Sequence, residues 1–302
     1  MLQKRNPAND KLIININGTL LPRGEAGVSP FDSSVQNGDA VWEGLRLYQK
    51  RVFRLHAHLD RLRKSAFALS YEGFPSDDIL IREVRRTLSA NSMTDGVHVR
   101  LTVSRGLKYT SGLDPRINQM GCSFFILAEH KPPVFNNSEG IGLITSSQCR
   151  PFANVLDQNI HSCNQLTSIL AKIEANNAGV DDAVLLDPNG MIAETSSTHI
   201  FLVRHGCILT PTTHACPEGI TRKVILEICQ QHNIDCSVQD IPSAELAHAD
   251  EIFVTGTMGE ITPVREINSR TLDMIPGPLT AKVAQHFRDC THNPAEGTMI
   301  VD

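Results

Sequence analysis

Residues 171–203 read AKIEANNAGVDDAVLLDPNGMIAETSSTHIFLV, and this stretch decides the fold class. Its first part continues a helical pattern that we expect to run from about Asn164 to Ala178. Gly179 follows at the position where helices often end in a left-handed residue. Two short apolar runs then flank a Pro-Asn-Gly turn at 188–190, which predicts a β-hairpin, and THIFLV at 198–203 predicts a further strand. One segment thus contains both helix and sheet.

The same mixture continues on both sides of this stretch. Residues 97–104, VHVRLTVS, alternate cleanly, so Arg100 lies on the polar face of a predicted strand. Strands and helices interleave without a strict βαβ order, which favours an α+β fold. Residues 131–139, KPPVFNNSE, are typical of a linker. They predict a smaller N-terminal α/β domain over 1–130 and a larger C-terminal domain over 140–302.

Composition narrows the function classes. The 302 residues carry a net charge of −5 and are 41% hydrophobic, which gives no reason to expect nucleic acid or an anionic membrane as partner. No run approaches the roughly 20 apolar residues of a membrane span, and the first residues lack the apolar core of a signal peptide. The eight cysteines form no CxxC pair, which favours reduced thiols in a cytoplasm. The twelve histidines are scattered, and we expect no metal site.

Four separated stretches carry a family resemblance. They are GDAVWEGLRLYQKRVFRLHAHLDRLRKSA (38–66), AKIEANNAGVDDAVLLDPNGMIAETSSTHIFLV (171–203), PEGITRKVILEIC (217–229) and DEIFVTGTMGEITPV (250–264). In this order they resemble the class IV aminotransferases, the fold-type IV pyridoxal phosphate enzymes. That family includes branched-chain aminotransferase, D-amino-acid aminotransferase and aminodeoxychorismate lyase.

The resemblance implies a two-domain, D-amino-acid aminotransferase-like architecture. It implies a homodimer whose site lies between the domains and close to the partner subunit, with most of the cofactor site on the C-terminal domain. The cofactor would be pyridoxal phosphate. The reaction would move an amino group from a small, possibly branched-chain, amino acid to a 2-oxo acid.

The resemblance also implies a set of phosphate ligands. Arg61 matches the family's phosphate-binding arginine, and Thr257 matches a threonine that meets the same phosphate. The amides of Ile220 and Thr221, at the start of a predicted helix, suit a phosphate because they are free and lie at its positive end. The residues alone also allow ordinary structural roles: a surface arginine paired with Asp60, a turn threonine and a common helix cap.

Further residues match the cofactor ring and the substrate. Glu194 matches the carboxylate that keeps the pyridine nitrogen protonated, so that the ring can stabilise a substrate carbanion. Arg100, Met258 and Gly259 match positions near the substrate. The alternatives are a solvated glutamate at a strand end and an arginine paired at a sheet surface.

Position 161 departs from the family. The run Ile160 to Asn164, IHSCN, aligns without a gap on Ile-Lys-Ser/Thr-x-Asn, so His161 takes the place of the lysine that bonds to the cofactor aldehyde and moves the substrate's α-proton. Imidazole has no primary amine, and any bound cofactor would be held non-covalently. Gln165, Pro217 and His199 also replace family residues. Three alternatives follow: an aminotransferase, a non-catalytic ligand-binding or scaffold protein, and an acid–base enzyme that uses His161.

Overall fold

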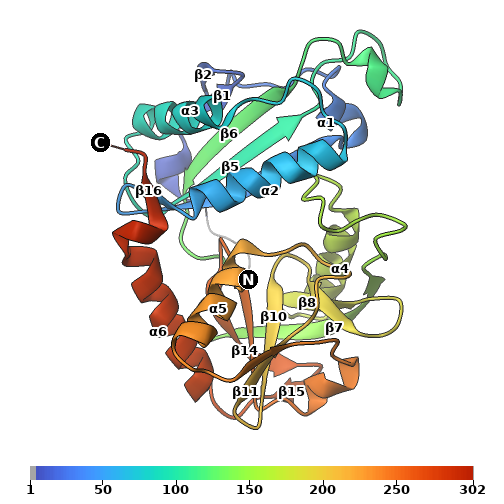
Figure 1. The fold of residues 1–302 in the computed structure, drawn as a ribbon, viewed down its shortest axis with the longest axis vertical. Coiled ribbons are helices and arrows are strands. Elements are labelled where there is room, and N and C mark those ends of the chain that lie inside the picture. Colours follow the sequence, from blue (N-terminus) through green and yellow to red (C-terminus); the bar gives the residue numbers. More distant parts are fainter. Residues whose placement is uncertain (1–4, 302) are drawn as a thin grey trace. The chain divides into compact units, whose positions relative to one another are not determined.

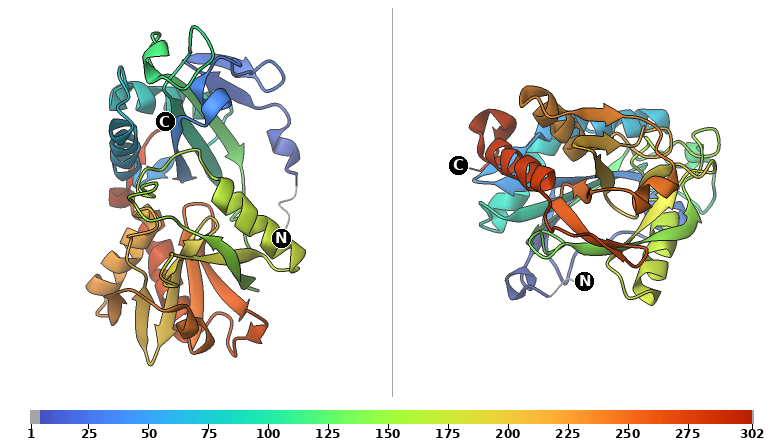
Figure 2. Two further views of the ribbon diagram at one scale, coloured as in Figure 1. Left: turned by 90° about the vertical axis from the view of Figure 1, so that its right-hand side faces the viewer. Right: turned by 90° about the horizontal axis from the view of Figure 1, so that it is seen from below.

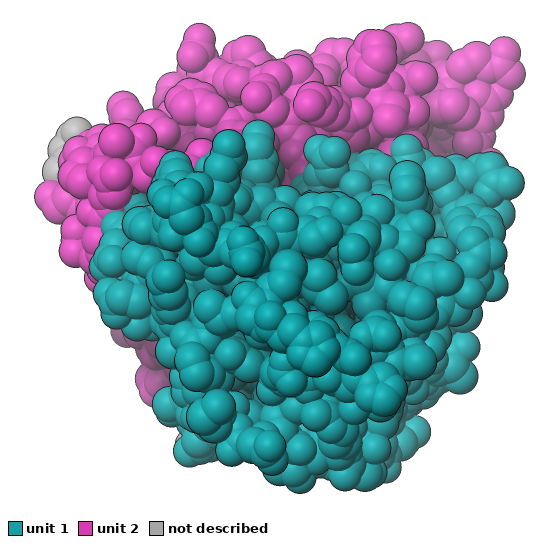
Figure 3. Space-filling model, turned by 60° about the horizontal axis from the view of Figure 1, so that its bottom comes forward, with its two compact units in different colours: residues 1–3, 133–159, 165–290 teal, residues 4–132, 160–164, 291–302 magenta. Residues whose placement is uncertain are grey.

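A computed structural model describes residues 5–301. The chain forms two compact units, which Figure 3 shows in different colours. Within the described residues, unit 1 comprises 133–159 and 165–290, and unit 2 comprises 5–132, 160–164 and 291–301. No helix in this range is long and apolar enough to cross a membrane.

Unit 2 is built on a seven-stranded antiparallel sheet in the order β16-β4-β3-β5-β6-β1-β2. Its central strands β3, β5 and β6 pair along almost their whole length. The hairpin β1–β2 turns at Asn17 and Gly18, which both have positive φ. The strands are β1 (Ile13–Ile16), β2 (Thr19–Pro22), β3 (Ala40–Tyr48), β4 (Arg51–Phe53), β5 (Val97–Ser104), β6 (Ser123–His130) and β16 (Gly297–Met299).

Two helices of unit 2 pack on one face of this sheet (Figure 1). They are α2 (Leu55–Ala68) and α3 (Asp77–Ala90), and a short α1 (Ser33–Asn37) precedes β3. The Ser76 hydroxyl accepts a hydrogen bond from the amide of Ile79 and caps α3. The core between helices and sheet contains Leu59 and Leu62 of α2 and every odd-numbered residue of β5 from Val97 to Val103. Burial of this apolar stripe leaves His98 and Arg100 on the other face.

Unit 1 holds a nine-stranded mixed sheet with the main order β12-β11-β10-β13-β14-β7-β8-β9, and β15 pairs with β14. The sheet curls, because the end strand β9 also contacts β10. The strands are β7 (Ile141–Cys149), β8 (Asp182–Leu186), β9 (Ile192–Thr195), β10 (His199–Arg204), β11 (Cys207–Thr210), β12 (Cys236–Val238), β13 (Glu251–Gly256), β14 (Glu260–Ile267) and β15 (Arg270–Thr271).

Three helices accompany this sheet: α4 (Leu166–Asn177), α5 (Ile220–Gln231) and α6 (Pro278–His292). Figure 2 shows α4 beside β7 and β8. Ala171 and Ala175 of α4 pack against Ala183 and Leu185 of β8. Gly179 follows the C-cap residue Ala178 of α4 and adopts φ +75°, as a helix-terminating glycine does. The hairpin β8–β9 follows, as the sequence predicts.

The chain leaves unit 2 at Pro132, inside the predicted linker 131–139, but the units are not continuous in sequence. Residues 160–164 belong to unit 2 because they bond to β3, and the C-terminal segment belongs to it because β16 pairs with β4. The single boundary expected from composition does not include these two returns, which depend on backbone pairing between distant segments.

Candidate active site

The segment that carries His161 is fixed to the first half of β3 by backbone hydrogen bonds. The amide of Cys163 donates to the carbonyl of Ala40 at 2.8 Å, and the amide of Trp42 donates to the carbonyl of His161 at 3.0 Å. This edge of β3 is open because β4 pairs only with Leu47 and Tyr48. Residues 160–163 occupy the open edge, and the position of the His161 backbone is therefore set by the sheet of unit 2.

The ring of His161 has a defined orientation. It stacks on the indole of Trp42, with ring centroids 4.3 Å apart, and its Nδ1 lies 2.5 Å from the Trp42 carbonyl oxygen. A carbonyl oxygen only accepts hydrogen bonds, so Nδ1 carries the proton and Nε2 holds the lone pair of the neutral ring. Among residues 5–301, no hydrogen bond engages Nε2. The geometry thus leaves one basic nitrogen of His161 available.

The carboxylate of Glu43, on β3, lies close to this histidine and contacts three basic side chains. The carboxylate is fully buried. Arg61 donates to both oxygens, from Nε at 2.7 Å and from Nη2 at 2.8 Å. His58 donates from Nδ1 at 2.6 Å, and Nδ1 of His161 lies 3.5 Å from Oε1. We call Glu43, His58, Arg61 and His161 the Glu43 cluster.

The charges of the Glu43 cluster follow from burial and pairing. Burial alone would raise the pKa of Glu43, but Arg61, His161 and His58 together hold that pKa well below its usual value. Glu43 is therefore an ionised carboxylate at neutral pH. Burial lowers the pKa of His58, and its hydrogen bond to Glu43 only partly offsets this. His58 accordingly acts as a neutral donor to the carboxylate.

Arg100 lies next to this cluster on the polar face of the sheet. Its guanidinium carbon is 3.9 Å from the centroid of the Trp42 ring, a cation–π contact, and its Nη2 lies 3.7 Å from the sulfur of Cys163. Nearby, burial together with Lys131, Arg46 and Arg100 itself lowers the pKa of His98 to about 3. Neither ring nitrogen of His98 has a hydrogen-bond partner in the described chain. Three cationic side chains, Lys131, Arg46 and Arg100, are therefore close enough to His98 to disfavour its protonation.

Arg105 has a different environment from Arg100. It forms an ion pair with Asp39 at 2.6 Å and donates to the carbonyl of Leu69 at 2.8 Å. Its guanidinium also lies 4.5 Å from the ring centroid of Tyr71. Arg105 thus links the C-terminal end of α2 to the loop before β3 through a hydrogen bond and an ion pair.

In unit 1, Glu194 at the end of β9 is almost completely buried. Nε of Arg150 lies 2.9 Å from its Oε1, yet this N–H is not aligned for a hydrogen bond and has no other partner in the described chain. Nδ1 of His199 lies 3.8 Å from Oε2, while Nε2 of His199 donates to the carbonyl of Pro217 at 2.8 Å. A buried carboxylate with a cation beside it suits a protonated ring nitrogen as a further partner.

The first turn of α5 supplies amides for an anion. Gly219 is the N-cap, and no side chain caps the helix. Ile220 and Thr221 open the helix, and Thr221 is buried. Uncapped amides at the positive end of a twelve-residue helix suit a phosphate. The predicted phosphate site therefore has suitable donors in unit 1.

Thr257, Met258 and Gly259 form the turn between β13 and β14. The carbonyl of Met258 accepts from the amide of Val134, and the carbonyl of Gly259 accepts from the Asn137 side chain at 3.1 Å. These bonds fix the backbone of the turn.

The predicted site residues fall into two groups. His161, Arg61 and Arg100 lie in unit 2, and Glu194, Ile220, Thr221, Thr257, Met258 and Gly259 lie in unit 1.

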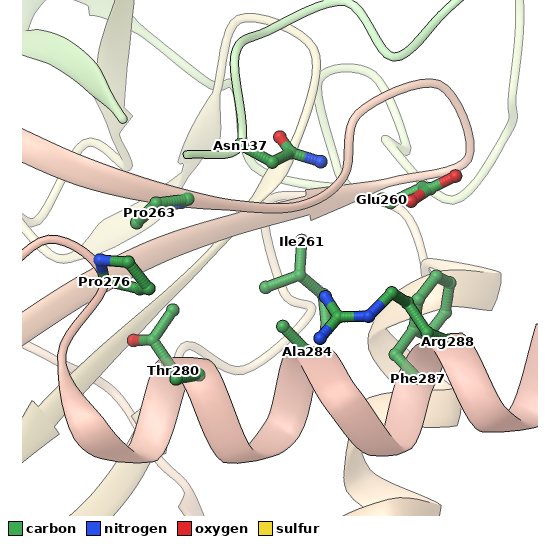
Figure 4. Close-up of a pocket in the computed structure, with 10 residues that line it drawn as sticks. Asn137, Glu260, Ile261, Pro263, Pro276, Thr280, Ala284, Phe287 and Arg288 are labelled. Atoms are coloured by element: carbon green, nitrogen blue, oxygen red, sulfur yellow. The ribbon is translucent and has the colours of Figure 1, made fainter. Parts of the chain in front are cut away.

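A cavity of about 120 Å³ lies between β14 and α6 of unit 1. Figure 4 shows the residues that line it. Its lining includes Asn137, Thr280 and Arg288, and it includes no predicted site residue. The Thr280 hydroxyl is buried without a hydrogen-bond partner among the described residues.

No group of three or more His, Cys, Asp or Glu side chains in residues 5–301 could hold a metal ion. All eight cysteines are free.

Three residues that interact with the predicted site residues, Glu43, His58 and Arg150, were not themselves predicted. Glu43 stands in a nearly continuous buried strand, where a carboxylate demands partners, and this is the signal that could have found it. His58 precedes Arg61 by three helical positions and so shares its face of α2. Arg150 follows β7 and offers no local signal. Asp60, the alternative partner for Arg61, instead pairs with Arg63 at 2.9 Å.

A sequence model of the family described as "Amino-transferase class IV" matches residues 40–267. The chain belongs to this family. The branched-chain-amino-acid aminotransferase-like protein 2 of Arabidopsis thaliana is 44% identical over 94% of this chain, which spans only about half (51%) of that relative. The branched-chain-amino-acid aminotransferase of Pseudomonas aeruginosa is 31% identical over 94% of both chains.

A solved structure shares the fold. The branched-chain amino acid aminotransferase from Thermobaculum terrenum, in its PLP-form (holo-form), has a TM-score of 0.83 and 25% identity, covering 94% of this chain and 94% of that one. The predicted α+β, fold-type IV architecture and the family resemblance are confirmed. The roles of the individual residues stay predictions.

Proposed function

We propose that this chain binds pyridoxal phosphate or its amine form without a covalent bond, and that His161 acts as the proton-transfer base of an amino transfer. The observation that supports this most is the orientation of His161. Nδ1 is held by the Trp42 carbonyl at 2.5 Å, which leaves Nε2 as the basic nitrogen. The proposed substrates are a small, possibly branched-chain, amino acid and a 2-oxo acid.

The residues present fit the cofactor. Glu194, with Arg150 beside it, would hold the ring nitrogen, and the first amides of α5 would hold the phosphate. Arg61 and Thr257 would add further phosphate contacts. When bound, the cofactor supplies an electron sink for the negative charge that develops on the substrate's α-carbon.

The cofactor would be held without a covalent bond because the imidazole of His161 has no primary amine. Lys172 does not replace the missing lysine. It lies in α4 of unit 1, where its Nζ donates to the carbonyl of Asp181.

Nε2 of His161 would accept the proton from the α-carbon of the amino-group donor, and in the second half of the reaction it would deliver a proton to the α-carbon of the amino acid that forms from the 2-oxo acid. Nδ1 keeps its own proton on the Trp42 carbonyl during both transfers. A positioned base of this kind contributes a factor of about 10²–10⁴ to the rate.

The rival proposal is a non-catalytic protein that keeps the fold to bind a ligand. The missing amine at position 161 supports it. It predicts cofactor binding with no amino transfer.

The test is binding followed by turnover. Calorimetry with pyridoxamine phosphate measures binding, and amino transfer from leucine, alanine or D-alanine to 2-oxoglutarate measures activity. We expect His161→Gln to retain binding and to lose about 10²–10⁴-fold in rate. His56→Gln, which changes an exposed histidine of the same unit, is the control and should keep full activity. Binding without turnover in the wild type would favour the rival, and turnover unaffected by His161→Gln would refute the role of His161.

We also propose that the chain works as a homodimer, or a higher homo-oligomer, in a reducing cytoplasm. Its eight free thiols support the reducing compartment. Sedimentation of the purified protein tests the oligomeric state, which the family resemblance suggests.

A further inference from the structure

The lone pair on Nε2 is only half of what a base requires, because the ring must also become a cation when the proton arrives. His161 is mostly buried, with its side chain 15% exposed. A cationic ring in such a place is costly unless an opposite charge lies close to it. The question is which group supplies that charge.

The described contacts of unit 2 place Glu43, two basic side chains of α2 and Arg100 near His161. Glu43 of β3 faces Nδ1 at 3.5 Å. His58 and Arg61 of α2 both bond to that same carboxylate. Arg100 of β5 lies over the Trp42 ring and contacts Cys163, two residues from His161. Glu43 is the single acid in this set.

The arrangement places the negative charge on the correct side of the ring. Nδ1–H is held between the Trp42 carbonyl and Glu43, so the ring cannot turn over without losing the hydrogen bond and the nearby carboxylate. Nε2 lies across the ring from this anchor. The pairing of a buried carboxylate with the non-basic nitrogen is the geometry by which an acid residue orients a catalytic histidine.

We propose that Glu43 is the positioning residue of His161: together with the Trp42 carbonyl it keeps the proton on Nδ1 and Nε2 free, and it stabilises the imidazolium that proton uptake creates. His58 supports Glu43 as a neutral donor at 2.6 Å and adds no competing charge. Arg61 does compete, because its own charge is drawn to the same two oxygens. The catalytic part of this proposal rests on the proposed function, whereas the orientation and the charge pairing do not.

The experiment is a nitrogen NMR titration of the histidine rings in protein without cofactor. The signals of His161 are assigned by their loss in His161→Gln. In the wild type we expect the tautomer with the proton on Nδ1. Glu43→Gln should lower the pH at which Nε2 of His161 takes up a proton by about one unit, the lower end of the effect of a nearby opposite charge, because Arg61 shares the carboxylate.

Three variants complete the test. Glu83→Gln removes another buried, arginine-paired carboxylate of unit 2 and should leave the His161 titration unchanged. Arg61→Gln should shift it upward, which gives a second, opposite result if Glu43→Gln does not fold. Glu43→Asp keeps the charge and should restore most of the shift.

The outcomes separate this proposal from the proposed function. A His161 titration that is the same in Glu43→Gln and the wild type, or a proton found on Nε2 of the neutral ring, would overturn the positioning role. If Glu43→Gln does not fold, an unchanged titration in Arg61→Gln would do the same. The expected shifts in a protein that transfers no amino group would overturn the catalytic role of His161 alone. If both hold, Glu43→Gln should lower kcat and leave KM nearly unchanged.

Discussion

Position 219, at the start of α5, requires a glycine because a neighbouring side chain fills the space beside it. The backbone conformation does not require one. Its φ of −71° and ψ of 131° are open to any residue. A Cβ atom at this position would overlap Nε2 of His199 and would lie 2.6 Å from Cδ2 and 2.9 Å from Cε1 of the same ring. The ring of His199 thus occupies the space of a side chain at position 219, and Gly219→Ala forces one of the two to move.

The loss of folding stability in Gly219→Ala can be estimated from these contacts. Ordinary carbon contacts are about 3.5–4.0 Å, so the ring must move by about 1 Å. That movement breaks the 2.8 Å hydrogen bond from Nε2 to the Pro217 carbonyl. A lost buried hydrogen bond costs about 1 kcal/mol, and overpacking costs about 1–3 kcal/mol. We expect Gly219→Ala to lower the free energy of unfolding by about 2–4 kcal/mol.

A double-mutant cycle isolates this effect. Urea unfolding followed by circular dichroism is measured for the wild type, Gly219→Ala, His199→Ala and the double variant. With the ring removed, Gly219→Ala should cost less than about 1 kcal/mol, so the coupling energy should reach about 2 kcal/mol. Gly24→Ala, at a glycine with nothing within 4 Å, is the control for glycine replacement itself. An equal cost of Gly219→Ala with and without the His199 ring would refute this reasoning.

Three further predictions concern binding, covalent chemistry and pH. Arg61→Ala should weaken pyridoxamine phosphate binding by about 10–150-fold in calorimetry, the loss of a charge-assisted contact, whereas Arg63→Ala on the exposed side of α2 should not; equal losses would remove Arg61 from the phosphate site. His161→Lys should gain a cofactor absorption band, and borohydride should then fix the cofactor to the peptide containing position 161, which the wild type should never show. His98→Gln should stabilise the protein more at pH 5 than at pH 8. The pKa of His98 is about 3 when folded and about 6.5 when unfolded, so stability is lost as pH falls below 6.5, by about 2 kcal/mol at pH 5; thermal unfolding that shows the same effect at both pH values would contradict this.

The sequence by itself determined the fold class and most of the elements. The apolar alternation of 97–104 identified β5 and the face on which Arg100 lies, because strand side chains alternate between two surfaces. Gly179 and the Pro-Asn-Gly turn marked the end of α4 and the hairpin after it, because these residues favour specific backbone conformations. The four family stretches determined the family. Such signals are local, or they are repeated among relatives, and both can be read along one chain.

Only the tertiary structure brought the Glu43 cluster together. Its members come from β3, α2 and the segment 160–164, and no local pattern joins them. The segment reaches Glu43 because β4 is too short to pair with the first half of β3, which leaves an open edge for residues 160–163. The pairing of Arg150 with Glu194 likewise joins separate segments, the residue after β7 and strand β9. Sequence determines which side chains exist, whereas the choice of partner for a buried charge depends on backbone pairing between segments far apart in the chain.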